Sequence, residues 1–271
     1  GSAGTSSVSF VHGLDRVYEL ETRPFANALE EFCPAQAVRA RSCSTSVALA
    51  ACADPGRPWK ISTRYLKCEL RFCSICASSC SRKTTARLIN AYERLSKRED
   101  AVAVHLTLLG DVTHPRFARA AAEKLRNQLN AFRDSLPGQG LPFLGACWGI
   151  EFASVDGQCV RTHAHFVLLL RRSNDQDLDR SNSELIRDLW EGISGRSGDS
   201  DVNLAFKYSA SEITQSLRYT VKGAKRRTKS PGLLTAAQRA VLQIVLRGIR
   251  LTQPNGELRV RRERASPPSL G

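Results

Sequence analysis

Two histidines separated by a single residue could bind one metal ion together. His163 and His165 lie in the apolar, strand-like segment 161–170, and residues two apart on a strand point to the same face of a sheet. Glu151 lies on the preceding strand-like segment and could face them across a hairpin, which would supply a carboxylate ligand. Two imidazoles and a carboxylate suit a divalent ion. The alternative is a hydrogen-bonded Glu-His pair on a solvated sheet face.

A second group of reactive side chains lies in the segment 211–222, which has helical spacing. Tyr219 and Lys222 are three residues apart and are therefore neighbours on one helix face, with Gln215 and Glu212 one and two turns earlier. A phenol is a poor nucleophile until it ionises, and positive charge from a metal or from Lys222 would favour ionisation. The alternative is a tyrosine that only packs its ring and leaves its hydroxyl at the surface.

Most of the nine cysteines fall in one stretch with the spacing of metal ligands. Cys68, Cys73 and Cys76 lie close together, and a Cys-x-x-Cys pair lets two thiolates reach one tetrahedral zinc. Cys43 is the predicted fourth ligand, because zinc ribbons close when a pair returns across a hairpin. The remaining alternatives are Cys33, Cys52 and Cys80. Four thiolates leave no open position, so we predict a structural zinc site.

The elements that must position these groups can be read from the spacing of apolar residues. Four segments have strand patterns, at 102–109, 145–154, 161–170 and 202–208, with turns at 110–111 and 155–158. Helical spacing occurs at 114–137, 183–193, 211–222 and 235–246, and a basic helix is expected at 81–95. The order β-α-β-β-α-β is typical of a ferredoxin-like, split-βαβ fold on an antiparallel sheet. We therefore predict an α+β fold of this type with an N-terminal cysteine-ligated zinc module.

The same patterns divide the chain into five parts. We predict an N-terminal segment over 1–32, a zinc-binding module with a basic helix over 33–100, and a core that carries both chemical groups over 101–230. A helical extension follows over 231–258, and the Arg-rich tail 259–271 is expected to be disordered.

Charge and hydropathy narrow the class of partner. The chain has 40 Lys and Arg against 26 Asp and Glu, a formal charge of +14, which favours a polyanion and most of all nucleic acid. A generally basic protein or an anionic membrane surface are the alternatives. No apolar run approaches the roughly 20 residues of a membrane-spanning helix. We expect no membrane insertion and a cytoplasmic location, where cysteines stay reduced.

In their order along the chain, these motifs resemble the HUH endonucleases, and specifically the replication initiator (Rep) proteins of rolling-circle plasmids. Four features carry the resemblance: Cys-Glu-Leu-Arg-Phe-Cys-Ser-Ile-Cys ending at Cys76, the strand His105-Leu-Thr-Leu-Leu, His163-Ala-His165 after Glu151, and Tyr219-Thr-Val-Lys222. Arg247-Gly-Ile-Arg250 through Asn255-Gly256 is also similar to the end of that family. The resemblance spans about residues 33–258.

This resemblance implies a site-specific single-strand DNA endonuclease and strand transferase of a bacterial cytoplasm that initiates rolling-circle replication. Tyr219 would attack the scissile phosphate to give a 5′-phosphotyrosine link and a free 3′-hydroxyl. His163, His165 and Glu151 would hold Mg²⁺ or Mn²⁺ on that phosphate, and Lys222 would orient it or stabilise charge. The partners would be single-stranded DNA at a replication origin and a separate helicase, because the chain contains no P-loop motif.

One position departs from the resembled family. Those initiators often carry a glutamate one turn before the tyrosine, taken to activate the terminating water, and here that position is Gln215, which cannot act as a base. Glu212, one turn further back, is our hypothesis for this role. The alternative functions are an HUH transposase or relaxase, and a non-enzymatic, zinc-stabilised nucleic-acid-binding regulator in which Tyr219 is only packed.

Overall fold

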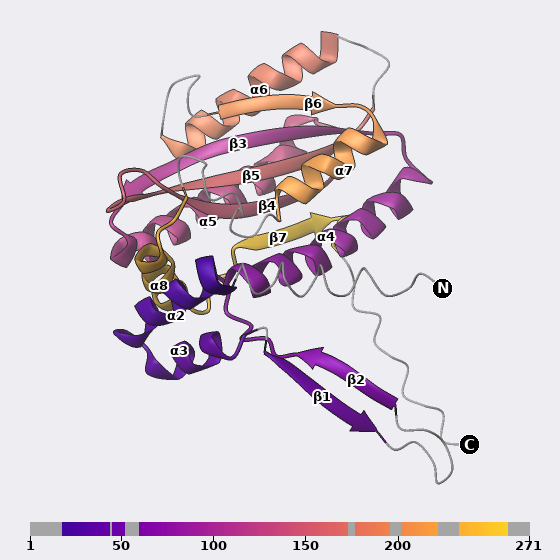
Figure 1. Ribbon diagram of the computed structural model, residues 1–271. Helices are drawn as coiled ribbons and strands as arrows, with labels where there is room; N and C mark the ends of the chain where they lie inside the picture. The colour runs from indigo at the N-terminus through magenta and orange to yellow at the C-terminus, as the bar shows by residue number, and fades with distance from the viewer. Residues whose placement is uncertain are drawn as a thin grey trace, which may run out of the picture.

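A five-stranded antiparallel sheet forms the centre of the protein, with strands in the order β6-β3-β5-β4-β7 (Figure 1). The computed structural model describes residues 18–43, 45–51, 60–172, 177–195, 202–221 and 233–259. The strands of the sheet are β3 (Ala101–Thr113), β4 (Phe143–Ser154), β5 (Val160–Arg171), β6 (Val202–Lys207) and β7 (Thr252–Gly256). Helices cover both faces, which explains the nearly continuous apolar run at the end of β5.

One face of the sheet is covered by α5 (Ala118–Ser135) and α6 (Asp177–Ser194). Large aromatic side chains fill the space between these helices and the strands. Phe132 of α5 lies edge-on to Phe166 of β5 and to Trp190 of α6, with ring centroids 5.2 Å and 5.6 Å apart. Edge-to-face pairs at such distances add to the free energy gained by burying the rings. This layer is the largest part of the hydrophobic core.

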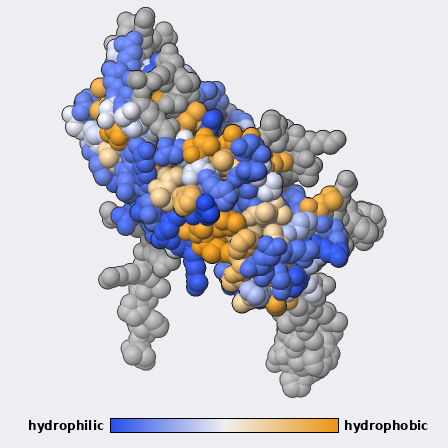
Figure 2. Space-filling model, turned by 90° about the vertical axis from the view of Figure 1, so that its left-hand side faces the viewer, coloured by the Kyte–Doolittle hydropathy of each residue, from blue (hydrophilic) through white to orange (hydrophobic). Residues whose placement is uncertain are grey.

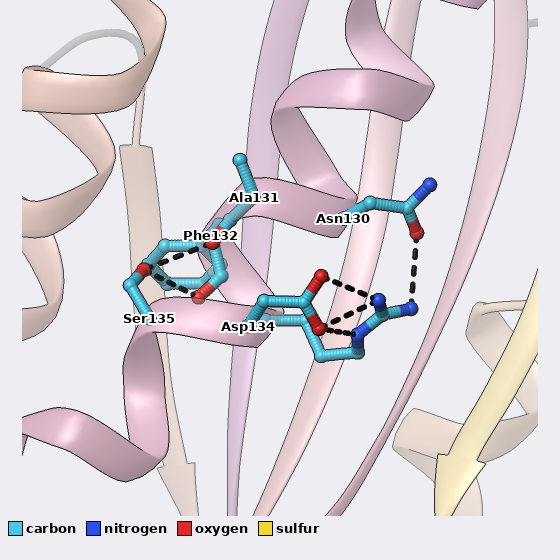
Figure 3. A network of polar contacts seen from close by, with 6 residues as sticks. Asn130, Ala131, Phe132, Asp134 and Ser135 are labelled. Carbon is cyan, nitrogen blue, oxygen red and sulfur yellow. Dashed lines mark hydrogen bonds and ion pairs between the residues drawn. The ribbon is translucent and has the colours of Figure 1, made fainter.

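A local polar network marks the end of α5 (Figure 3). The Ser135 hydroxyl donates to the carbonyl of Phe132 at 2.9 Å, so it satisfies a carbonyl in the last helical turn. Arg133 donates to the amide oxygen of Asn130 at 3.1 Å. A short 3-10 helix, Leu136–Gln139, then leads towards β4.

The opposite face is covered by α4 (Ser74–Ser96) and α7 (Ala210–Tyr219). Leu88 and Leu95 of α4 and Leu217 of α7 pack on small and branched residues of the strands such as Ala103 and Val167. A capping box begins α7, in which Ser209 and the residue three positions later bond to each other's backbone amides. The two helices leave polar side chains of β3, β4 and β5 partly exposed near the end of α7.

The N-terminal part packs against the C-terminal part around a group of cysteines. After a π-helical turn (Tyr18–Thr22), the helices α2 (Arg23–Glu30) and α3 (Pro34–Arg41) share a buried cluster with α8 (Ala236–Val245). Two further strands, β1 (Ser46–Ala51) and β2 (Lys60–Tyr65), form an antiparallel hairpin that extends away from the body (Figure 1). The residues between the two strands, 52–59, which include Pro55, Gly56 and Pro58, lie outside the described residues. Within the described ranges, no helix is long and apolar enough to cross a bilayer.

The α+β class and the antiparallel sheet are confirmed, but the turn predicted at residues 110–111 is wrong. The strand β3 continues through this point with a bulge between Leu109 and Val112. Gly110 permits the bulge, because a Cβ there would lie 2.2 Å from Thr162 Oγ1. The sequence pattern also missed α2, α3 and β7. The predicted disordered tail lies outside the described residues except for its first residue, Arg259.

Candidate active site and cysteine cluster

Three potential metal ligands meet on the sheet face that α7 covers in part. His163 of β5 lies directly opposite Glu151 of β4 in the strand register, and His165 lies opposite Gly149. The Glu151 Oε2 atom is 3.4 Å from His163 Nε2 and 3.8 Å from His165 Nε2. All three side chains are partly buried. The hairpin register therefore brings the two histidines and the carboxylate together.

The geometry and the donor atoms of this group fit a divalent cation. The three ligand atoms lie within 4.8 Å of one another. The Glu151 Oε1 atom is buried and has no hydrogen-bond partner among the described residues. Burying a polar oxygen without a partner costs free energy, and a cation bound at this carboxylate would offset that cost. Glu151, His163 and His165 would be the protein ligands of such an ion.

Tyr219, the last residue of α7, lies beside the same group. The centroid of its ring is 6.4 Å from that of His165 and 6.2 Å from that of His105 in β3. The tyrosine therefore reaches the sheet at the histidines and not elsewhere on the helix-covered face. Lys222, predicted to stand beside it, lies outside the described residues.

His105, which the sequence marked only as the first residue of a strand motif, also belongs to this site. Its Nε2 atom lies 3.4 Å from His165 Nδ1, and Thr107 Oγ1 lies 3.3 Å from the same nitrogen. These contacts engage Nδ1 of His165 and leave its Nε2 atom facing Glu151, the arrangement of a histidine ligand held by outer partners. Burial, with the nearby charge of Lys207, lowers the pKa of His105 to about 4, so His105 is neutral at neutral pH.

Glu212 lies at the other end of α7 from Tyr219. Its carboxylate accepts hydrogen bonds from the Ser209 hydroxyl at 2.8 Å and from the Ser209 amide at 3.1 Å, and these bonds lower its pKa. It lies seven positions before Tyr219, roughly 10 Å along the helix axis. The structure therefore uses Glu212 as a helix cap and does not bring it to the tyrosine, contrary to our hypothesis from helical spacing. Gln215 between them is exposed.

Four buried cysteines form a second potential metal site beneath α2 and α8. The Sγ atom of Cys43 is 3.5 Å from that of Cys76 and 3.7 Å from that of Cys73, and Cys68 Sγ is 3.6 Å from Cys76 Sγ. Tetrahedral zinc with bonds of about 2.3 Å requires sulfur atoms about 3.8 Å apart. Hydrogen bonds from the other three thiols lower the pKa of Cys73, which favours its thiolate form. The cluster can hold a metal such as zinc.

The backbone also contacts the cluster through one amide. The amide of Glu69 donates to Cys76 Sγ at 3.3 Å, and Glu69 has φ +57°, the only positive value of a non-glycine residue in the described part of the chain. Of the other candidate ligands, Cys80 is exposed, Cys33 is half-buried away from the cluster, and Cys52 lies outside the described residues. Cys43 is therefore the residue that joins the three cysteines of the knuckle.

We expect Glu151→Gln to weaken Mn²⁺ binding by at least about 10-fold, because the substitution removes the negative charge of the candidate site and keeps its shape. Electron paramagnetic resonance of free Mn²⁺ during titration of the zinc-loaded protein measures the affinity. Glu93→Gln, at an exposed carboxylate of α4, is the matched control and should leave the affinity unchanged. Equal affinities of the Glu151 variant and the wild type would exclude this carboxylate as a ligand.

The arrangement joins a phenol, a potential divalent-cation site and a neutral histidine on one partly open sheet face. Such a group can support nucleophilic attack on a phosphate whose charge a metal neutralises. In comparisons of the whole chain with known proteins, no protein-family model, no curated protein and no solved structure matches it.

Proposed function

We propose that this protein is a metal-dependent single-strand DNA endonuclease of the HUH type that initiates rolling-circle replication. One observation carries the proposal: the ring of Tyr219 lies beside that of His165, and the Nε2 atom of His165 faces Glu151. The element order β3-α5-β4-β5-α6-β6 in a fully antiparallel sheet adds support, since it is the split-βαβ pattern expected for this family. A structural zinc in the cysteine cluster would complete the resemblance.

In the proposed reaction, the phenol oxygen of Tyr219 forms a bond to the scissile phosphorus and the bond from phosphorus to the 3′-oxygen breaks. Tyr219 loses one proton and the leaving 3′-oxygen gains one, so the products are a 5′-phosphotyrosine and a free 3′-hydroxyl. Mg²⁺ or Mn²⁺ held by Glu151, His163 and His165 would supply positive charge to the phosphate. His105 and Thr107 orient His165 for this role through its Nδ1 atom.

The end of the sheet towards which β3 runs offers a surface for bases. Phe117 is 55% exposed there, the guanidinium of Arg116 lies 4.7 Å from the centre of its ring, and the His114 ring lies 6.5 Å away. Figure 2 faces this end and shows hydrophobic residues gathered among hydrophilic ones. Aromatic rings beside basic groups bind single strands by stacking on bases while the cations contact the backbone. With a net charge of +14, this surface supports a single-stranded DNA substrate.

We expect Phe117→Ala to weaken binding of single-stranded DNA by about 1–3 kcal/mol, roughly 5- to 150-fold in Kd, because one stacking platform is lost. Fluorescence anisotropy at one fixed salt concentration measures the affinity. Phe32→Ala is the matched control, since Phe32 is also exposed but lies between α2 and α3. Equal losses of DNA affinity in the two variants would show that exposed phenylalanines bind DNA nonspecifically and that the surface around Phe117 is not a specific binding site.

Covalent trapping tests the proposed function. The protein is incubated with a randomised pool of single-stranded DNA labelled at the 3′ end, with Mn²⁺ or with EDTA, and denatured before electrophoresis. A 3′ label stays with the strand that carries the 5′-phosphate, so the proposal predicts a labelled protein band with Mn²⁺ only, and peptide mapping should find the label on Tyr219. Tight binding without any covalent band would overturn the proposal and favour a nucleic-acid-binding regulator.

A further inference from the structure

The end of α7 rests directly on the backbone of β4 at Gly149. A Cβ atom built on Gly149 would lie 1.8 Å from the carbonyl oxygen of Thr220 and 2.9 Å from its carbonyl carbon. Both atoms belong to the backbone, so no side chain can turn away to make room. A glycine inside a strand often marks a place where another backbone approaches closely. Here the approaching backbone is that of the residue that follows Tyr219.

The segment after Tyr219 is held from several sides at this contact. The Thr220 hydroxyl donates to the carbonyl of Leu217 at 2.8 Å and lies 3.9 Å from Cys147 Sγ in β4. The Ser81 hydroxyl of α4 donates to the carbonyl of Val221. Thr220 and Val221 are both buried. The segment that follows Tyr219 is therefore held between α4 and β4, and these contacts restrain its movement away from the sheet.

The same glycine is also next to the candidate metal ligands. Gly149 lies opposite His165 in the strand register and two residues before Glu151 on the same strand face. The contact between Gly149 and Thr220 therefore joins the backbone next to Tyr219 directly to the strand that carries Glu151.

We propose that Gly149 is a positioning residue that sets the height of Tyr219 above His165 and Glu151. This inference rests on the proposed function, and it identifies a residue that touches neither the phosphate nor the metal. A methyl group at residue 149 must move the Thr220 carbonyl by more than about 1 Å to reach an ordinary contact distance, and a misplacement of about 1 Å at a reacting centre can cost about 100-fold in rate.

The test compares Gly149→Ala with Gly192→Ala. Gly192 is exposed in α6 and a Cβ there meets no atom within 4 Å, so its substitution tests only the loss of a glycine. At saturating DNA and Mn²⁺, the single-turnover rate of adduct formation should fall about 100-fold in Gly149→Ala and stay at the wild-type value in Gly192→Ala. The Kd values for DNA and for Mn²⁺ should stay within about twofold of wild type, since neither binding surface changes.

Several outcomes would overturn the inference. A Gly149→Ala protein with a lowered Tm but a wild-type rate would show that Gly149 serves packing alone, and a parallel loss of Mn²⁺ affinity would show damage to the ligands instead of to the tyrosine. If Gly149→Ala does not fold, Ser81→Ala releases the same segment at Val221 and should lower the rate several-fold without changing either Kd; an unchanged rate contradicts the inference. If the wild type forms no adduct, the proposed function itself is contradicted. If the wild type and Gly149→Ala react at equal rates, only the positioning role of Gly149 is contradicted.

Discussion

A Tyr219→Phe variant should bind single-stranded DNA as tightly as the wild type and form no covalent adduct. The substitution removes one oxygen atom, the proposed nucleophile, and keeps the ring that lies beside His105 and His165. Removing the nucleophile of an enzyme that forms a covalent intermediate lowers the rate by at least about 10⁴-fold. Anisotropy with labelled DNA measures binding, and the appearance of the shifted band on a denaturing gel measures the reaction.

Tyr208→Phe is the matched control for this experiment. Tyr208 is 46% exposed and lies just before α7, with the guanidinium of Arg172 5.7 Å from the centre of its ring. Loss of its hydroxyl should leave both binding and adduct formation at wild-type levels. An adduct that persists in Tyr219→Phe would assign the attack to another residue, and an adduct lost in both variants would point to a general effect of removing tyrosine hydroxyls.

Replacing Cys73 with alanine should abolish zinc binding and destabilise the protein by more than about 4 kcal/mol. In a structural zinc site the free energy of metal binding is part of the free energy of folding, and three thiolates hold the ion much less tightly than four. The loss of stability should extend beyond the cysteines, because the two residues before Cys73 bond to the C-terminal part. The Phe72 amide donates to Gln243 Oε1 at 3.2 Å and Arg71 donates to the Ile249 carbonyl at 2.7 Å.

Urea unfolding followed by circular dichroism measures the loss of stability in Cys73→Ala, and elemental analysis measures its zinc content. Cys80→Ala is the control, since Cys80 is an exposed cysteine of α4 outside the cluster, and it should keep one zinc per chain and the wild-type midpoint. A Cys73→Ala protein with unchanged zinc content and stability would exclude the cluster as a zinc site.

The sequence predicted the parts of the fold whose own residues determine their structure. Apolar spacing over a long segment predicted α5, and strand-like runs predicted β3 and β5, because burial of those residues requires one type of element. The strand β7 could not be predicted in this way. Its residues, Thr-Gln-Pro-Asn-Gly, have little β propensity, and they pair with β4 only because the folded sheet leaves that edge open.

In the candidate site too, the sequence predicted the residues that neighbouring segments bring together and missed those that depend on distant ones. Alternation in one strand singled out His163 and His165, and the hairpin turn correctly predicted that Glu151 faces them. His105 and Thr107 are also two residues apart on one strand, but their part in the site depends on the pairing of β3 with β5, which are far apart in the chain. Gly149 gave no local signal at all, because its role arises from where α7 docks.

The contacts of the cysteine cluster also determine the order in which the chain can fold during synthesis. All four cysteines leave the ribosome within one short stretch, but the groups that accept hydrogen bonds from Phe72 and Arg71 follow 171 to 178 residues later. Contacts of such long sequence separation form late and slow the folding reaction. The apolar side of α2, which packs against α8, therefore stays uncovered while most of the chain is translated. A nascent chain of this protein is exposed to aggregation until α8 has emerged.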